Sequence, residues 1–391
     1  MLLTFVLDCR ITEGYYCFDS FFSKEILAVY RENGLLKRTM TAEIAREKRS
    51  AEQMNGGQVL KWKRFLVLLA VPALLLSGCS ERSEVENAYD VFGAQDTYST
   101  VVLSSDEEEE SDDGITLFAQ DLCVGGLENT ESEDVIADCA EAAAVFSLAT
   151  GEITYAQNIY ETLYPASTTK ILTAYIALKY GNLDDEITVS QEAIDELAGT
   201  GSSTCGLTVG DTVTLRDLLY GLLLRSGNDA ANVIAEYISG STDEFAELMN
   251  EEAAALGATG SHFVNANGLP DEDHYTTVYD LYLILNAAVG NETFVEIISS
   301  TAYQVTLNHA DGTSEEGTWT NTNGYLAGTY EEPEGISVIG GKTGTTTAAG
   351  YCLVLYSENE SGDPVISIVL KGNTRSDMYK LMTQVLENFG N

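Results

Sequence analysis

The sequence predicts an α/β domain in which one antiparallel sheet is built from both ends of the domain and a helical lobe is inserted between them. The prediction rests on order: strand-like segments come first, capped helices follow, and strand-like segments return before a final helix. With 45% hydrophobic residues, 5 Pro and 34 Gly in 391 residues, the composition is that of a globular chain. It excludes collagen, coiled coil and wholesale disorder.

Each element has its own local signal. Two strands are predicted at 144–149 and 153–157, around a tight turn that contains Gly151. Three helices are expected to begin at residues that are followed three positions later by an acidic residue, namely Thr214, Ser241 and Thr277. Strand-like segments return at 302–307, 336–343, 351–356 and 365–370, and a helix over 376–389 closes the chain.

The stretch before this domain has the parts of a secretion signal, which we place at 54–78. A cationic start at 61–64 precedes twelve apolar residues and the small residues before Cys79. Twelve apolar residues are short of the roughly 20 that span a bilayer, which disfavours the alternative of a retained anchor helix. The cut region resembles a bacterial lipobox, in which Cys79 would be lipidated and hold the protein on the outer face of the cytoplasmic membrane.

Residues 1–53 form a doubtful upstream leader, because a secretion signal normally begins a chain. Met54 is the expected true start, and a genuine cytoplasmic extension is the alternative. Residues 79–139 are predicted to be an acidic flexible spacer, since seven Asp and Glu fall within 106–113 and repel one another. The globular domain is then placed at 140–391.

Charge narrows the range of partners. Residues 1–78 carry 11 of the 20 Lys and Arg and 8 of the 61 Asp and Glu, which leaves 9 basic and 53 acidic residues from Cys79 onward. So negative a surface repels phosphate backbones, and no nucleic-acid partner is expected. Metal and cofactor are not expected either, because the chain has only three His and its Cys spacing fits no zinc site. Pairing among the four Cys after residue 79 is left open, with three connectivities for the set Cys123, Cys139, Cys205 and Cys352.

Three motifs carry chemistry. Ser167-x-x-Lys170 places a hydroxyl and an amine on one helical face, where a neutral lysine could take the proton of the serine. Ser226-Gly227-Asn228 lies between two helical patterns, where a turn can direct a hydroxyl and a carboxamide into a cleft. Each pattern is common on its own.

The third motif, Gly340 to Thr345, ends a β-like run. Its glycines let a substrate backbone lie against the strand, while Lys342 and Thr343 offer a cation and a hydroxyl to a carboxylate. By itself it would be a glycine-rich turn before a hairpin.

Together and in this order, Ser167-x-x-Lys170, Ser226-x-Asn228 and Lys342-Thr343-Gly344 resemble the motifs of the penicillin-recognising serine enzymes. Within that group the chain is most similar to the serine D-alanyl-D-alanine carboxypeptidases, over about residues 140–391. The resemblance implies a β-lactamase/transpeptidase-like fold. It also implies peptidoglycan pentapeptide stems as substrates and β-lactam antibiotics as inhibitors.

The resemblance also implies a role for each residue in a two-step acyl transfer without a cofactor. Ser167 attacks, Lys170 takes its proton, and Ser226 passes a proton to the departing D-alanine. Asn228 binds the peptide, Thr343 and Arg375 bind the terminal carboxylate, and Lys342 makes Lys170 less basic. The backbone N–H groups of Ser167 and Thr345 form the oxyanion hole, beside Gly344. For Arg375 a surface charge at a helix start is the alternative interpretation.

Three other functions remain open. A β-lactamase shares the motifs, but the chain lacks the Glu-x-x-Leu-Asn motif of class A enzymes, and 247–250 has the wrong spacing. A non-catalytic acidic surface lipoprotein would not need both lysines. Endopeptidase activity on cross-links could use the same site.

Overall fold

The structure is a computed structural model that describes residues 122–126 and 128–391. These residues belong to the compact unit Ser111–Asn391. The upstream leader, the signal peptide, Cys79 and most of the acidic spacer lie outside the described residues, so their predictions stand as predictions.

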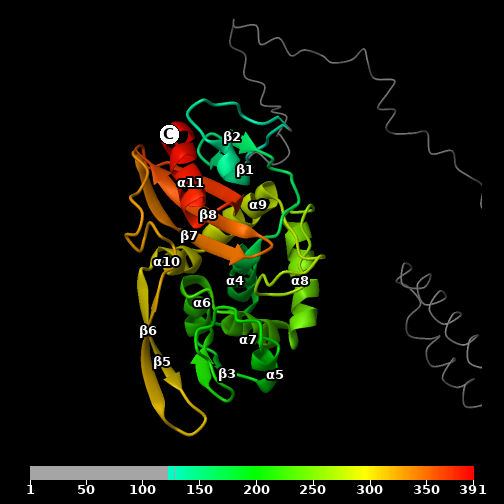
Figure 1. The fold of residues 1–391 in the computed structure, drawn as a ribbon. Helices are drawn as coiled ribbons and strands as arrows, with labels where there is room; N and C mark the ends of the chain where they lie inside the picture. Colours follow the sequence, from blue (N-terminus) through cyan, green and yellow to red (C-terminus); the bar gives the residue numbers. More distant parts are fainter. Residues whose placement is uncertain (1–121, 127) are drawn as a thin grey trace, which may run out of the picture. The chain divides into compact units, whose positions relative to one another are not determined.

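The main sheet has five strands in the order β2-β1-β9-β8-β7, and every neighbouring pair is antiparallel. Their bounds are β1 Ala140–Ser147, β2 Glu152–Gln157, β7 Ile336–Thr346, β8 Gly350–Asn359 and β9 Pro364–Gly372. Two strands come from the start of the domain and three from its end (Figure 1). The predicted antiparallel sheet with an inserted helical region is therefore confirmed.

Alternation along the central strands divides the interior into two apolar cores. Ala143 and Val145 of β1 face the core under α11 (Arg375–Phe389), while Ala144 and Phe146 face the larger core under α9 (Val278–Val289). One face of the sheet is thus covered by the C-terminal helix and the other by the helical lobe (Figure 1).

The helical lobe fills the chain between β2 and β7. Besides α9 it contains α4 Lys170–Tyr180, α5 Gln191–Asp195, α6 Leu215–Leu224, α7 Asn228–Ser239, α8 Thr242–Ala255 and α10 Glu292–Ser299. The helix starts predicted at Thr214, Ser241 and Thr277 are confirmed, since each side chain accepts a hydrogen bond from the backbone three residues on. No single described helix is long and apolar enough to cross a membrane; only α9 and α10 together pass that test, bent by 107°.

One predicted strand joins a different sheet. The segment predicted at 302–307 becomes β5 (Ala302–Asn308), which pairs with β6 (Ser314–Thr320) rather than with the main sheet. With β3 (Glu186–Thr188) and β4 (Thr212–Thr214) it makes a second sheet in the order β3-β4-β5-β6. Alternation predicts that a segment is extended, but it does not specify which strand it will pair with.

The packed body begins before residue 140. Cys123 is 1% exposed, its N–H donates to the Tyr282 hydroxyl at 2.7 Å, and Tyr279 donates to its carbonyl at 2.9 Å. The Thr130 N–H donates to Ala156 O at 2.7 Å, which covers the open edge of β2. The C-terminal end of the stretch assigned to the spacer therefore packs against the domain.

Candidate active site

Ser167 lies in a tight turn at the start of α4. The turn is the 3₁₀ segment Ala166–Thr169, and Ala166 has a left-handed φ of 50°. Gly268 makes this backbone possible, because a Cβ at Gly268 would stand 1.9 Å from Ala166 O. The turn leaves Ser167 half-buried, with Lys170 Nζ 3.2 Å from its Oγ. The predicted pairing of hydroxyl and amine is thus present.

Lys170 is fully buried and is held by two oxygen acceptors. Nζ donates to Asn228 Oδ1 at 2.6 Å and to the backbone carbonyl of Asn267. Burial, reinforced by the nearby Lys342, holds the pKa of Lys170 well below its usual value. A neutral amine has two N–H groups and one lone pair. With both N–H groups directed at these oxygens, the lone pair is left for the hydroxyl of Ser167, which can donate its proton there.

The second motif forms the turn between α6 and α7. Ser226 has a left-handed φ of 58°, and its carbonyl accepts a hydrogen bond from the Ser203 hydroxyl at 3.1 Å. Gly227 N donates to Gly221 O at 3.1 Å, and Asn228 is the first residue of α7. Asn228 is 3% exposed and contacts Lys170, so the structure brings the second motif to the first.

The third motif lies on β7, at the edge of the main sheet. A Cβ at Gly344 would stand 3.0 Å from Ser167 N, so this strand lies directly beside the turn that carries Ser167. Lys342 is 1% exposed, its Nζ donates to Thr343 O at 2.8 Å, and burial lowers its pKa to about 7. The structure therefore gathers all three motifs in one place.

Of the remaining predicted residues, Thr343 and Thr345 lie on β7 and Arg375 lies on α11. Thr343 Oγ1 is 2.9 Å from Thr322 Oγ1, and Thr345 is exposed and pairs with Tyr351 of β8. Arg375 is exposed at the start of α11, with its guanidinium carbon 6.0 Å from the centre of the Tyr351 ring. Arg375 therefore contacts Tyr351, the β8 residue that pairs with Thr345.

Some residues of the site were missed by sequence reasoning. Asn267 acts through its backbone carbonyl, which every residue type has, so nothing in its side chain predicts the contact. Thr322 comes from the connection between β6 and β7 and has no motif of its own. The Asn267-Gly268 pair gave a usable signal, because a glycine after Asn often marks a left-handed turn, and Gly268 has a φ of 86°.

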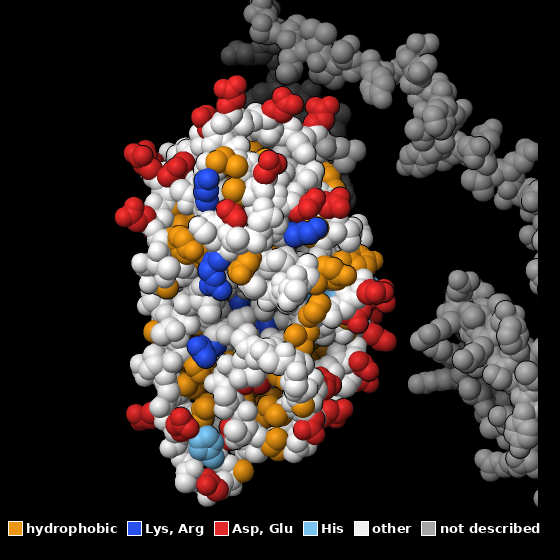
Figure 2. All heavy atoms as spheres, viewed as in Figure 1, with side chains coloured by type: hydrophobic (Ala, Val, Ile, Leu, Met, Phe, Trp, Pro, Cys, Tyr) orange, Lys and Arg blue, Asp and Glu red, His pale blue; other side chains and the backbone are white. Residues whose placement is uncertain are grey.

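Figure 2 shows the surface charge on the face drawn in Figure 1. Lys and Arg side chains gather along the middle of this face, around a hollow in which further blue atoms are visible, while Asp and Glu surround the outline. A positive centre on an acidic surface suits a substrate with a terminal carboxylate.

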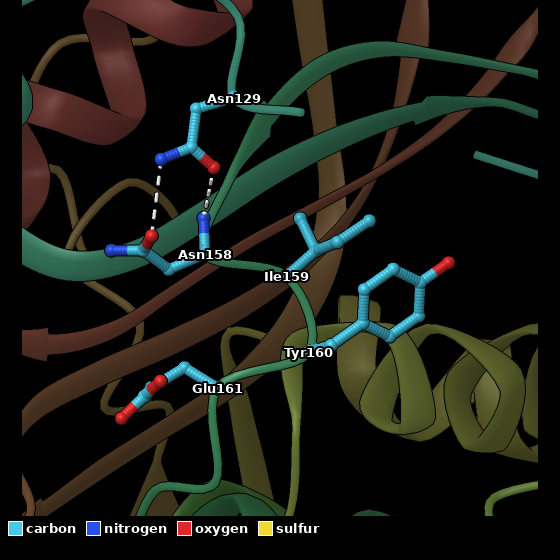
Figure 3. Close-up of a pocket in the computed structure, with 5 residues that line it drawn as sticks. All are labelled: Asn129, Asn158, Ile159, Tyr160 and Glu161. Atoms are coloured by element: carbon cyan, nitrogen blue, oxygen red, sulfur yellow. Dashed lines mark hydrogen bonds between the residues drawn. The ribbon is translucent and has the colours of Figure 1, made fainter. Parts of the chain in front are cut away.

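A second hollow lies elsewhere and has no catalytic residue. It is lined by Asn129, Asn158, Ile159, Tyr160 and Glu161 (Figure 3). Asn129 and Asn158 hydrogen-bond to each other there, at 3.0 and 2.8 Å. These bonds fasten the N-terminal segment to the end of β2.

Neither a metal cluster nor a disulfide is found in the part of the chain that the structure describes. It contains no group of three His, Cys, Asp or Glu side chains that could hold an ion. Its four cysteines are free and buried, and burial raises the pKa of Cys352 to about 12.

Comparison with known proteins agrees with the geometry. The D-alanyl-D-alanine carboxypeptidase family (peptidase family S11) matches residues 128–374. A D-alanyl-D-alanine carboxypeptidase of Streptomyces sp. strain K15 is 34% identical over 276 residues, which cover 67% of this chain and 92% of that protein. The carboxypeptidase DacF of Bacillus subtilis is 32% identical over 253 residues, which cover 63% of this chain and 61% of that protein.

The fold has a counterpart among solved structures. The crystal structure of the Streptomyces K15 DD-transpeptidase matches with a TM-score of 0.60 and 34% identity, over 64% of this chain and 97% of that one. The match to DacF spans less than two thirds of the length of that relative. Because the family match covers more than half of the sequence and includes all three motifs, the chain belongs to the D-alanyl-D-alanine carboxypeptidase family of serine peptidases.

Proposed function

We propose that the protein is a serine D,D-carboxypeptidase that removes the terminal D-alanine from peptidoglycan stem peptides. The observation that carries the proposal is the fully buried Lys170 amine, 3.2 Å from Ser167 Oγ, with both of its remaining hydrogen-bond directions occupied. This arrangement lets a serine lose its proton at neutral pH.

Acylation begins when Ser167 Oγ attacks the carbonyl carbon of the penultimate D-alanine while Lys170 takes the hydroxyl proton. The carbonyl oxygen becomes negative and is stabilised by the backbone N–H groups of Ser167 and Thr345. The close approach of Gly344 to Ser167 N supports this role, because it brings the two donors to one side of the nucleophile.

Departure of D-alanine needs a proton and a hold on its carboxylate. Ser226, at the strained turn, relays the proton, and Asn228 orients the peptide amide. Lys342, Thr343 and Arg375 bind the carboxylate, with Thr322 bonded to Thr343 as support. Among the described strands β7 pairs with β8 alone, so its other edge has no strand partner and could pair with an extended substrate. Water then releases the acyl group from Ser167.

The structure favours a lasting penicillin adduct over rapid hydrolysis. A β-lactam presents the same amide to Ser167, and a β-lactamase needs a carboxylate to activate the water that removes it. No carboxylate among the described residues hydrogen-bonds to Ser167 or Lys170. Asn250, in the segment nearest to a class A motif, donates instead to the backbone at Ala246 and Phe263.

The test combines fluorescent penicillin with an assay of D-alanine released from a pentapeptide stem. We expect lasting label and release of D-alanine, both abolished by Ser167→Ala and both unchanged by Ser361→Ala, which alters an exposed turn serine. Rapid loss of label would indicate a β-lactamase, and no label would indicate a non-catalytic binder. Transfer of the acyl group to added glycine in preference to water would indicate a transpeptidase.

The proposed place of action is the outer face of the bacterial cytoplasmic membrane. Its support is the lipobox-like sequence that ends at Cys79. Lipid on Cys79 would hold the catalytic domain near the wall, and the acidic spacer predicted from the sequence would allow it to reach its substrate.

A further inference from the structure

His274 is a buried titratable side chain that the proposed mechanism does not use. It is 1% exposed and follows the turn that carries Asn267. Val264 N–H donates to its Nδ1 at 3.1 Å, so Nδ1 is the unprotonated nitrogen of a neutral ring. The proton is then on Nε2, which lies 2.9 Å from Thr169 Oγ1 and donates to it. The hydrogen-bond partners therefore specify one tautomer.

Thr169 links His274 to the turn that carries Ser167. Its hydroxyl donates to Ala166 O at 2.8 Å and is fully buried. Ala166 has the left-handed φ of 50° and immediately precedes Ser167. A strained residue keeps its conformation only when its surroundings hold it. The hydrogen bonds from His274 to Thr169 and from Thr169 to Ala166 O stabilise this conformation of Ala166.

The same imidazole also fastens the loop that holds the base. Val264 begins the stretch that leads to Asn267, whose carbonyl accepts a hydrogen bond from Lys170 Nζ. The ring of His274 packs edge-on against Phe263, with centroids 5.5 Å apart and planes at 83°. One side of the ring thus holds the Ser167 turn, and the other holds the loop that orients Lys170.

We propose that His274 is a positioning residue that fixes Ser167 and Lys170 relative to each other, because its ring hydrogen-bonds to Thr169 on one side and to Val264 on the other. This inference rests on the proposed acyl-transfer function. It requires a neutral ring, because a proton on Nδ1 would face the Val264 N–H. Burial opposes protonation and lowers the pKa of His274 to about 4, although Asp271 acts in the opposite direction; His262 and Lys170 lower it further.

Thr169→Val tests the proposal with little change in shape. The variant keeps the volume of the side chain but loses both hydrogen bonds of the hydroxyl, so Ala166 and Ser167 are held less firmly. We expect the limiting rate of acylation by penicillin to fall about 10- to 100-fold, while the dissociation constant of the non-covalent complex changes less than about threefold. Thr169→Ser keeps the hydroxyl and is expected to stay within about threefold of the natural protein in both quantities.

A double-mutant cycle with His274→Gln separates positioning from general damage. If Thr169 and His274 act as one chain, the double variant should be no more than about threefold slower than the slower single variant. Thr168→Val is the matched control, because it removes a similar bond in the same turn, from Thr168 to Pro165 O at 2.8 Å, without touching His274. Because Thr168 does not contact His274, the fold-reductions in acylation rate caused by Thr168→Val and by His274→Gln should multiply in the double variant.

Three results would overturn the inference. They are acylation of Thr169→Val at the natural rate, equal slowing of the Val and Ser variants, or independent effects of Thr169→Val and His274→Gln. Circular dichroism and thermal unfolding establish that each variant is folded before its rate is interpreted. Absence of any penicillin adduct on the natural protein would instead contradict the proposed function, so the two failures are distinguishable.

Discussion

At the scale of single residues, the site depends on two lysines that are almost completely removed from water. Lys170 and Lys342 are 0% and 1% exposed, and neither has a carboxylate partner within the described residues. Burial disfavours the charged form of both amines. For Lys170 the loss of charge makes a base. For Lys342 it leaves an amine whose positive charge a bound substrate carboxylate would favour again.

This burial has a cost that depends on pH. The pKa of Lys342 falls from 10.5 to about 7 in the folded protein. Between pH 7 and pH 10.5 the unfolded chain therefore binds more protons at Lys342 than the folded protein does. Burial of Lys342 lowers the free energy of unfolding by its full amount below about pH 7, and this loss disappears as the pH rises toward 10.5. We predict that Lys342→Met raises the free energy of unfolding by at least about 1 kcal/mol more at pH 6 than at pH 9.

Urea unfolding at the two pH values measures this difference. Lys380→Met, which alters an exposed lysine of α11, should give the same small change at both. An equal effect of Lys342→Met at pH 6 and pH 9 would show that Lys342 keeps its ordinary pKa in the folded state.

At the scale of elements, the turn at Asn267-Gly268 is as important as the helix that carries Ser167. The turn supplies the carbonyl that accepts from Lys170, and its glycine lies directly against Ala166. Two tight turns that are far apart in sequence thus hold each other's backbone in place. Gly268 is needed here because its φ is left-handed and because a Cβ would clash with Ala166.

Gly268→Ala tests the contact between these turns. Gly362 has a similar φ, 82° against 86°, but has no atom within 4 Å of the place a Cβ would occupy, so Gly362→Ala reports the backbone strain alone. We predict a loss of about 1 kcal/mol for Gly362→Ala and of at least about 3 kcal/mol for Gly268→Ala. Acylation by penicillin should slow at least tenfold in Gly268→Ala only. Similar stability losses in the two variants would contradict the close packing.

At the scale of the whole molecule, the fold explains how the site is assembled. The turn of Ser167 follows the first two strands, Ser226 and Asn228 lie in the inserted helical lobe, and Lys342 lies on β7 near the end of the chain. Because the late strands pair with the early ones, β7 lies beside the start of α4 (Figure 1). Any break in the sheet would therefore separate the turn of Ser167 from Lys342 on β7.

Attachment to the membrane is the prediction that belongs to this scale. If Cys79 is lipidated, cells supplied with radioactive palmitate should label the natural protein, and membrane fractions should contain it. Cys79→Ser should abolish both without changing penicillin binding by the catalytic domain, because residue 79 lies outside residues 128–374 that match the family. Membrane retention of the unlabelled variant would instead favour an uncleaved anchor helix.

The sequence alone determined the three motifs, the helix starts at Thr214, Ser241 and Thr277, and the order in which extended segments and helices follow one another, because these depend on local spacing and capping. Only the tertiary structure decided that β5 leaves the main sheet, that Asn267 O holds Lys170, and that His274 and Thr169 support Ser167. Strand partners, backbone carbonyls and the depth at which an amine is buried are set by contacts between distant segments. No local pattern of residue types encodes them.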